Sequence, residues 1–110
     1  MPGLSLVYST LSSRDEALSV GRALVAEKLA ACANVLDGMT SIYHWQGAIQ
    51  QDAEAVLLAK TRTELVPAVM ERIRQLHRYD CPAILSWELQ AVSADYTQWL
   101  LANTLSPPTH

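Results

Sequence analysis

The chain has 110 residues, of which 50% are hydrophobic and 17% charged, and its formal net charge is −3. This length suits a single domain with one buried core, the composition argues against disorder, and the negative charge argues against binding to nucleic acid. No run of about 18 apolar residues is present to span a membrane, and the N-terminal segment has no signal-peptide pattern, so we expect a cytoplasmic protein whose two cysteines are free thiols.

The first third of the chain predicts a strand followed by a helix. Residues 4–8 form a short apolar run that is typical of a strand. Ser13 and Glu16 have the spacing of a capping box, in which each side chain accepts a hydrogen bond from the other residue's amide. A helix is predicted from there to about Ala30, because its apolar residues recur at helical spacing on one broad stripe.

Residues 32–61 are predicted to form one long β-hairpin. Its first arm is rich in β-branched and aromatic residues. Asp37-Gly38 predicts a bulge or bend, and Gln46-Gly47 predicts the tight turn at the tip. Both arms exceed the usual strand length of about five or six residues. Because a small domain cannot cover such arms alone, we expect the tip to pair with another chain.

The second half of the chain repeats the alternation of helix and strand. Thr63 is placed to cap a second helix, which should end near His77 because Pro82 and the residue before it disfavour helix. Residues 83–87 have the composition of a fourth strand. Ser93 is placed to cap a last helix.

The order β-α-β-β-α-β is that of the ferredoxin-like sandwich, an α+β fold in which an antiparallel four-stranded sheet carries two helices on one face. The predicted fold is therefore this sandwich with a long hairpin between its second and third strands and an extra C-terminal helix. We expect residues 1–104 to form this single domain and residues 105–110 to form a flexible tail.

Two helices cover only one face of such a sheet, which leaves the other face bare. Tyr43, Trp45, Val56 and Trp87 are candidates to lie on the bare face, and Trp99 is expected at a subunit contact as well. Aromatic residues are enriched at subunit contacts, and a bare apolar face of several hundred Å² is an association surface. The pattern therefore predicts an oligomer.

The stretch HRYDCPA at residues 77–83 brings together His77, Asp80 and Cys81, whose side chains suit Cu²⁺ or Zn²⁺ better than Mg²⁺. A competing interpretation makes His77 a cation at a helix C-terminus and Cys81 a small, partly buried hydrophobic residue. The same residue types could serve catalysis, but a Cys–His pair usually converges from distant parts of a sequence. We therefore expect no enzymatic activity.

Five motifs occur in order along the chain: LAACANVLDGMTSIYHWQG (Leu29–Gly47), LLAKTR (Leu57–Arg62), His77 with Tyr79 and Pro82, Tyr96-Thr97-Gln98-Trp99, and Asn103-Thr104. In these motifs the sequence resembles the CutA divalent-cation-tolerance family over nearly its whole length. The resemblance implies a homotrimer of ferredoxin-like subunits whose hairpins join neighbouring sheets. It also implies a role in tolerance to metal ions, with binding of copper or another divalent metal ion.

The sequence departs from the family at the stretch after the second helix. The family usually has His-Pro-Tyr-acid-x-Pro-Glu there, whereas this chain has Arg78 in place of the first proline and Ala83 in place of the final carboxylate. Some members carry a cysteine at the end of the first strand and a second histidine, and the matching positions here are Ser9 and Leu76. Of that copper-ligand set, only His77 remains, and Cys81 is a candidate replacement.

Further candidate residues lie outside this stretch. Cys32 belongs to the family motif and is either a buried small residue or a thiol that binds metal or undergoes redox chemistry. Lys60, Arg78 and Tyr79 are candidates for binding a small anion in a cleft between subunits. That alternative makes the protein a trimeric small-ligand sensor like the nitrogen-signalling proteins of the same architecture. A structural anchor for a partner protein is a third possibility.

Overall fold

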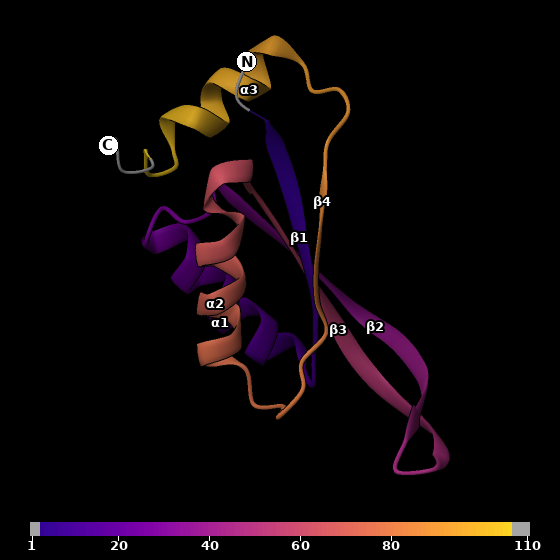
Figure 1. Cartoon of the computed structure of the whole chain (residues 1–110). Coiled ribbons are helices and arrows are strands. Elements are labelled where there is room, and N and C mark those ends of the chain that lie inside the picture. The colour runs from indigo at the N-terminus through magenta and orange to yellow at the C-terminus, as the bar shows by residue number, and fades with distance from the viewer. Residues whose placement is uncertain (1–2, 107–110) are drawn as a thin grey trace.

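The computed structural model describes residues 3–106 and confirms the predicted order of elements (Figure 1). The elements, in chain order, are β1 (Leu4–Leu11), α1 (Arg14–Ala26), β2 (Cys32–Trp45), β3 (Ala48–Arg62), the 3₁₀ turn η1 (Thr63–Leu65), α2 (Val66–Leu76), β4 (Ile84–Glu88) and α3 (Ala94–Ala102). The four strands form one antiparallel sheet in the order β2-β3-β1-β4. This is the ferredoxin-like sandwich with an additional C-terminal helix.

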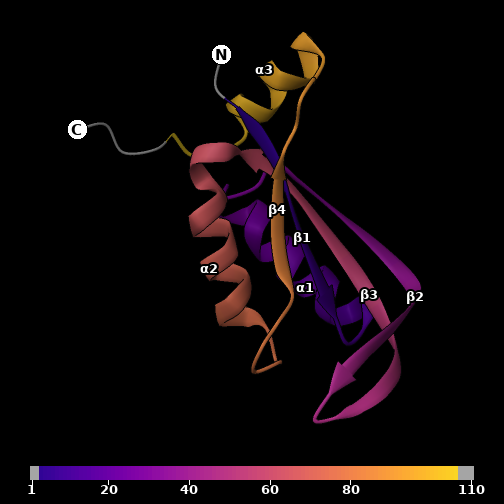
Figure 2. The same ribbon diagram turned by 45° about the vertical axis from the view of Figure 1, so that its right-hand side comes forward.

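Helices α1 and α2 lie on one side of the sheet, and the β2–β3 hairpin extends beyond them (Figures 1 and 2). The main core fills the space between these helices and the sheet. Its fully buried apolar residues are Val7, Leu11, Ala17, Leu24, Ala55, Leu57, Ala59, Val69 and Ile73. Gly21 lets α1 approach the sheet closely, because a Cβ there would lie 3.2 Å from Ala33 Cβ and 3.3 Å from Leu57 Cδ1.

We call the side of the sheet opposite α1 and α2 the open face. At one end it is covered by α3, since Leu4 of β1 packs with Leu100 of α3 in a second, smaller core. Arg62 ties this end together by donating to Leu101 O (2.7 Å) and to Thr104 Oγ1 (2.9 Å). The rest of the open face has no helix over it among residues 3–106.

The predicted bulge at Asp37-Gly38 is confirmed, and it changes which residues of β2 point to the open face. Leu36 pairs with Val56, but Met39 pairs with Glu54, so β2 carries one extra residue between these pairs. Gly38 has a φ of +80°, which glycine adopts without steric cost. Because side chains alternate along a strand, even-numbered residues of β2 face the open side before the bulge and odd-numbered residues do so after it.

This register places Tyr43 and Trp45 on the open face, together with Trp87 of β4. All three are exposed in the single chain, as are Leu36 and Leu85 nearby. Val56 was predicted to meet a neighbouring subunit, and it does point to the same face. However, it is only 7% exposed, because neighbouring side chains of the same chain already cover it. Val56 is therefore not available for such a contact.

Two details of the first helix differ from the prediction. The Ser13 hydroxyl accepts from the Glu16 amide (3.1 Å), but the Glu16 carboxylate accepts from the Ser12 hydroxyl (2.7 Å) and does not complete the capping box. Helix α1 ends at Ala26, before the expected Ala30, because Lys28 takes a left-handed conformation with a φ of 58° that ends the helix.

The side chains of Thr63 and Ser93, which were predicted to cap α2 and α3, make no capping hydrogen bond. Thr63 begins the 3₁₀ turn, and its hydroxyl bonds to Ser5 Oγ (2.8 Å), so it does not cap α2. Ser93 occupies the N-cap position of α3, but its side chain makes no capping bond. Its carbonyl instead accepts from the amide and the hydroxyl of Thr97, each at 3.0 Å.

The C-terminal end was predicted to be flexible from residue 105. The Leu105 amide donates to Lys28 O (2.9 Å), so this residue is attached to the end of α1. Residues 107–110 of the predicted tail lie outside the described residues. Within residues 3–106, no helix is both long and apolar enough to cross a membrane.

Substitutions at two neighbouring residues of α1 should differ greatly in their effect on the free energy of unfolding. Leu24 is fully buried, whereas Val25 is 40% exposed. Leu24→Ala should lower the free energy of unfolding by about 2–5 kcal/mol, because it removes buried methyl groups and leaves a cavity. Val25→Ala should change it by less than about 1 kcal/mol. Urea denaturation at a fixed protein concentration measures both values, and equal losses would contradict the assigned core.

Candidate functional site

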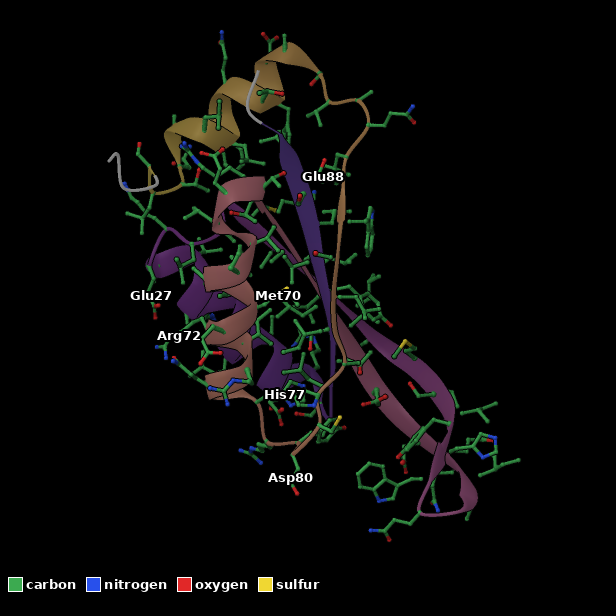
Figure 3. The ribbon with its side chains drawn as sticks, viewed as in Figure 1. Glu27, Met70, Arg72, His77, Asp80 and Glu88 are labelled. Atoms are coloured by element: carbon green, nitrogen blue, oxygen red, sulfur yellow. The ribbon has the colours of Figure 1, made fainter. Side chains whose placement is uncertain are left out.

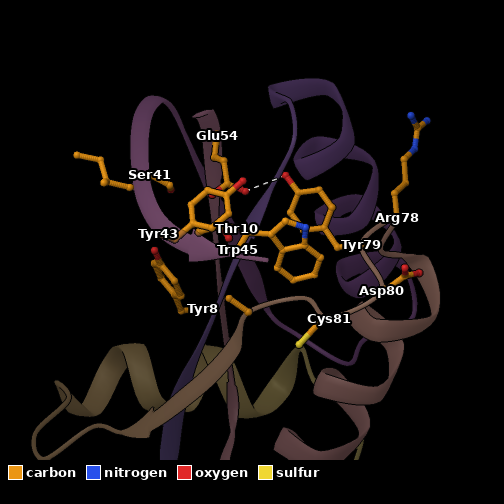
Figure 4. A pocket seen from close by; sticks show the side chains of 12 residues that line it. Tyr8, Thr10, Ser41, Tyr43, Trp45, Glu54, Arg78, Tyr79, Asp80 and Cys81 are labelled. Carbon is orange, nitrogen blue, oxygen red and sulfur yellow. Dashed lines mark hydrogen bonds between the residues drawn. The ribbon is translucent and has the colours of Figure 1, made fainter. Parts of the chain in front are cut away.

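A hollow of about 670 Å³ opens between the β2–β3 hairpin and the segment that precedes β4 (Figure 4). We call it the aromatic hollow. Four aromatic residues contribute to its lining: Tyr8, Tyr43, Trp45 and Tyr79. Its polar and small lining residues are Thr10, Ser41, Glu54, Arg78, Asp80, Cys81 and Ala83, and Ile42 completes it. Its volume lies within the range of small-molecule sites, about 300–1,000 Å³.

His77 begins the segment that closes this hollow. Helix α2 ends at Leu76, and His77 has an extended backbone with φ −79° and ψ 146°. Its Nδ1 accepts from the Tyr79 amide (3.2 Å), and its Nε2 lies 2.7 Å from Thr10 O. Because an amide can only donate, Nδ1 carries no proton and Nε2 donates to the carbonyl. Both ring nitrogens of His77 are therefore engaged, and neither has a lone pair free for a metal ion.

Tyr79 fastens the same segment to the hairpin. Its hydroxyl donates to Glu54 Oε2 (2.8 Å; Figure 4). Its ring lies against the His77 ring, with 4.7 Å between centroids. Burial, and then the hydrogen bond to Glu54, raise the pKa of Tyr79 far above its ordinary value of 10.0. On the hairpin itself, the Tyr43 hydroxyl donates to Asp52, and this bond raises the pKa of Tyr43.

Glu16 is a site residue that sequence reasoning missed. Its side chain is 8% exposed, and Arg78 Nε lies 3.6 Å from its Oε2. Its Oε1 is buried and has no hydrogen-bond partner. The spacing of Ser13 and Glu16 indicated a role for Glu16 in helix capping, and no other feature of the sequence indicated a buried carboxylate. Glu54 and Tyr8 were missed too, because only the folded sheet brings them into the lining of one hollow with Tyr79.

The predicted metal cluster is not preformed within the chain. Asp80 and Cys81 are exposed and line the aromatic hollow, whereas His77 is not among its lining residues and bonds through Nε2 to Thr10 O. Figure 3 shows Asp80 pointing away from His77. Among residues 3–106, no group of three or more histidine, cysteine, aspartate or glutamate side chains is arranged to hold a metal ion. The three residues are close in sequence, but a single chain does not direct them at one point.

Lys60 and Cys32 lie at the opposite end of the open face. They are cross-strand partners, and Lys60 Nζ lies 5.6 Å from the centroid of the Tyr96 ring of α3. Lys60 is six residues from Glu54 along β3, which corresponds to about 20 Å. A small anion therefore cannot contact Lys60 together with Arg78 and Tyr79 in one chain. Cys32 lies beside Lys60, whereas Cys81 lines the aromatic hollow, and both thiols are free.

The four aromatic residues predicted to contact other subunits are all exposed in the single chain. Tyr43 and Trp45 lie on the hairpin, Trp87 lies on β4, and Trp99 lies on the surface of α3 beside Tyr96. Tyr43 and Trp45 also line the aromatic hollow. A subunit contact at the hairpin would therefore lie next to this hollow.

Comparison with known proteins gives one consistent family. The family described as CutA1 divalent ion tolerance protein matches residues 5–103. A divalent-cation tolerance protein CutA from Thermus thermophilus is 41% identical over 99 residues, which are 90% of this chain and 96% of that protein. The chain is 35% identical to a chloroplastic CutA protein from Arabidopsis thaliana and spans 54% of that protein's length.

Solved structures agree with this assignment. The crystal structure of CutA1 from Oryza sativa superimposes with a TM-score of 0.93 at 32% identity, covering 96% of this chain and 97% of that one. The structure from Thermus thermophilus gives a TM-score of 0.88 at 40% identity, covering 92% and 98%.

The raised pKa of Tyr79 predicts a dependence of stability on pH. The folded protein keeps the phenol proton at a pH where the unfolded chain has lost it. The contribution of Tyr79 to the free energy of unfolding is therefore fully present below pH 10 and is lost as the pH rises above it. Between about pH 9 and about pH 11, the free energy of unfolding of the wild type should fall more steeply than that of Tyr79→Phe. Tyr96→Phe on α3 is the control and should follow the wild type. Parallel curves for all three proteins would contradict the assignment.

Proposed function

Because this chain belongs to the family of CutA1 divalent ion tolerance proteins, we propose that it acts in tolerance to divalent metal ions, by binding Cu²⁺ or another divalent ion as a homotrimer. The observation that carries this proposal is the family match over residues 5–103. The family description names ion tolerance and no reaction, and we propose no enzymatic activity. A cytoplasmic location stays a prediction, since one relative, from Archaeoglobus fulgidus, is described as periplasmic.

The open face supports the proposed trimer. Trp87 and Leu85 of β4 and Leu36 of β2 leave large apolar side chains exposed on it. The 14 residues of β2 also form an unpaired edge of the sheet, apart from their pairing with β3. Exposed apolar faces and long free strand edges are surfaces that proteins usually cover. Association of subunits through both would remove them from water.

Metal binding at the trimer requires donors from more than one chain. Imidazole and thiolate suit copper and zinc, so we propose that His77 and Cys81 contribute, with Asp80 as a third candidate. Since a single chain does not direct three such donors at one point, a second subunit would complete the site, and its Cys32 is a candidate. His77 would also have to release either the Tyr79 amide or Thr10 O. This competition predicts modest affinity.

A trimeric sensor of small molecules is the second candidate function, and the observation that favours it is the size of the aromatic hollow. This hypothesis places a small anion in a cleft between subunits, with Lys60, Arg78 and Tyr79 as its contacts. Because Lys60 lies about 20 Å along β3 from the strand position that bonds to Tyr79, one subunit would supply Lys60 and its neighbour Arg78 and Tyr79. The anchor function has no specific observation in its favour and stays a prediction.

The proposed trimer is tested by measuring the mass of the protein in solution. Light scattering at micromolar concentration should give three times the 12.1 kDa of one chain. Leu85→Glu places a charge on the open face, where Leu85 is 55% exposed, and should shift the mass toward that of a monomer. Val25→Glu, which adds the same charge on α1, should stay trimeric. A monomeric wild type would overturn the proposed assembly.

The metal proposal is tested by calorimetric titration with Cu²⁺ and Zn²⁺. His77→Gln keeps a polar side chain at this position but removes the imidazole, and it should lower the affinity about tenfold or more. Cys81→Ser should lower it as well. His44→Gln on the exposed hairpin is the matched control and should bind as the wild type does. Unchanged affinity in both His77→Gln and Cys81→Ser would remove this segment from the metal site.

A further inference from the structure

We propose that the aromatic hollow binds a small organic cation, with a quaternary or alkylated ammonium group as its recognised part. This goes beyond the binding of a divalent metal ion, which would use His77 and Cys81. Three features of the hollow favour such a ligand: four aromatic side chains in its lining, the Glu54 carboxylate among the lining residues, and the direction of Arg78.

The aromatic residues of the hollow come from three separate parts of the chain. Tyr8 lies on β1, Tyr43 and Trp45 lie on β2, and Tyr79 lies in the segment before β4. Figure 4 shows the rings of Tyr43 and Tyr79 on the two sides of Glu54, and Trp45 is a further lining residue from the hairpin. The faces of such rings carry partial negative charge and attract cations, and several rings around one space form the arrangement that recognises quaternary ammonium groups.

The charges around the hollow favour a cation over an anion. Glu54 lies between the rings, and Asp80 also lines the hollow. The Tyr79 hydroxyl donates to Glu54 Oε2, and the Tyr43 hydroxyl donates to Asp52, so each of these two rings lies beside a carboxylate group. These hydrogen bonds also hold the two rings in place before any ligand arrives.

Arg78 is the one basic residue in the lining, and it does not fill the hollow. Its side chain is 81% exposed, and its guanidinium is directed to Glu16, with Nε 3.6 Å from Oε2. Figure 4 shows it extended away from the aromatic rings. The positive charge of Arg78 is therefore offset by Glu16, and the space between the rings stays available to another cation.

The size and chemistry of the hollow favour an organic cation over a metal ion. A divalent ion gives up its hydration shell only for several oxygen, nitrogen or sulfur ligands, whereas ring faces suit a weakly hydrated cation that carries methyl or methylene groups. A volume of about 670 Å³ also exceeds the need of a bare ion and suits a ligand of several non-hydrogen atoms.

Choline and its uncharged analogue 3,3-dimethylbutan-1-ol test the role of charge, because they have the same shape. Each is titrated into the full-length protein in its native oligomeric state, and binding is followed by tryptophan fluorescence and calorimetry. We expect choline to bind and to quench Trp45, and the uncharged alcohol to bind at least tenfold more weakly. Equal binding of both compounds would overturn the proposal in favour of a simple apolar hollow. No binding of choline would also overturn it, as expected if a neighbouring subunit fills the space.

Three variants assign the binding to the hollow. Glu54→Gln removes the charge with little change of shape and should weaken choline binding about tenfold. Trp45→Leu should abolish the quenching, whereas Val25→Ala on α1, away from the open face, should leave both affinity and quenching unchanged. Light scattering on each variant separates a change of assembly from a loss of the ligand site. If Glu54→Gln and Trp45→Leu stay assembled and bind choline as the wild type does, the proposal is wrong, whatever the outcome of the Cu²⁺ titration.

Discussion

The extra residue in β2 at Asp37-Gly38 is the constraint on which the outer half of this molecule depends. Side chains alternate between the two faces of a strand, so a shift of one residue moves every following side chain to the other face. Without the bulge, His44 would point to the open face, and Tyr43 and Trp45 would point to the side of α1 and α2. The bulge instead places these two aromatic residues on the face that carries Tyr8 and Trp87.

The open face is consequently divided into two chemical environments. At one end, α3 covers the sheet, and Lys60 lies over the ring of Tyr96 beside Cys32. At the other end, the hairpin and the segment before β4 enclose the aromatic hollow, where the nearby carboxylate is Glu54. Since about 20 Å of strand separates these ends, a ligand bound by one chain can use only one of them. Association of subunits is the means by which residues from both ends could meet.

The segment after α2 is held by polar contacts at three points. His77 uses one ring nitrogen for Thr10 and the other for the amide of Tyr79, and Tyr79 continues the chain of contacts to Glu54 on β3. These bonds stabilise the wall of the aromatic hollow, and the same bonds occupy the donors that a metal ion would need. A metal ion bound by His77 would have to break one of these bonds, whereas an organic cation in the hollow would leave them in place. The variants of His77 and Glu54 distinguish these two cases.

The order of elements, the long hairpin, its bulge and its turn could be predicted from sequence, because apolar periodicity and glycine position are local properties. The strand residues predicted for the open face all point to it, although Val56 is already covered by side chains of its own chain. The cap at Thr63 was wrong, since its hydroxyl bonds to Ser5 on β1, and Ser93 occupies the predicted N-cap position but its side chain makes no capping bond. Adjacency in HRYDCPA indicated a ligand cluster, but only the folded chain decided that His77 turns to Thr10, that Tyr79 reaches Glu54 and that Glu16 is buried. Those contacts join residues 25 to 67 positions apart, and such pairings follow from how strands and helices pack rather than from any local pattern.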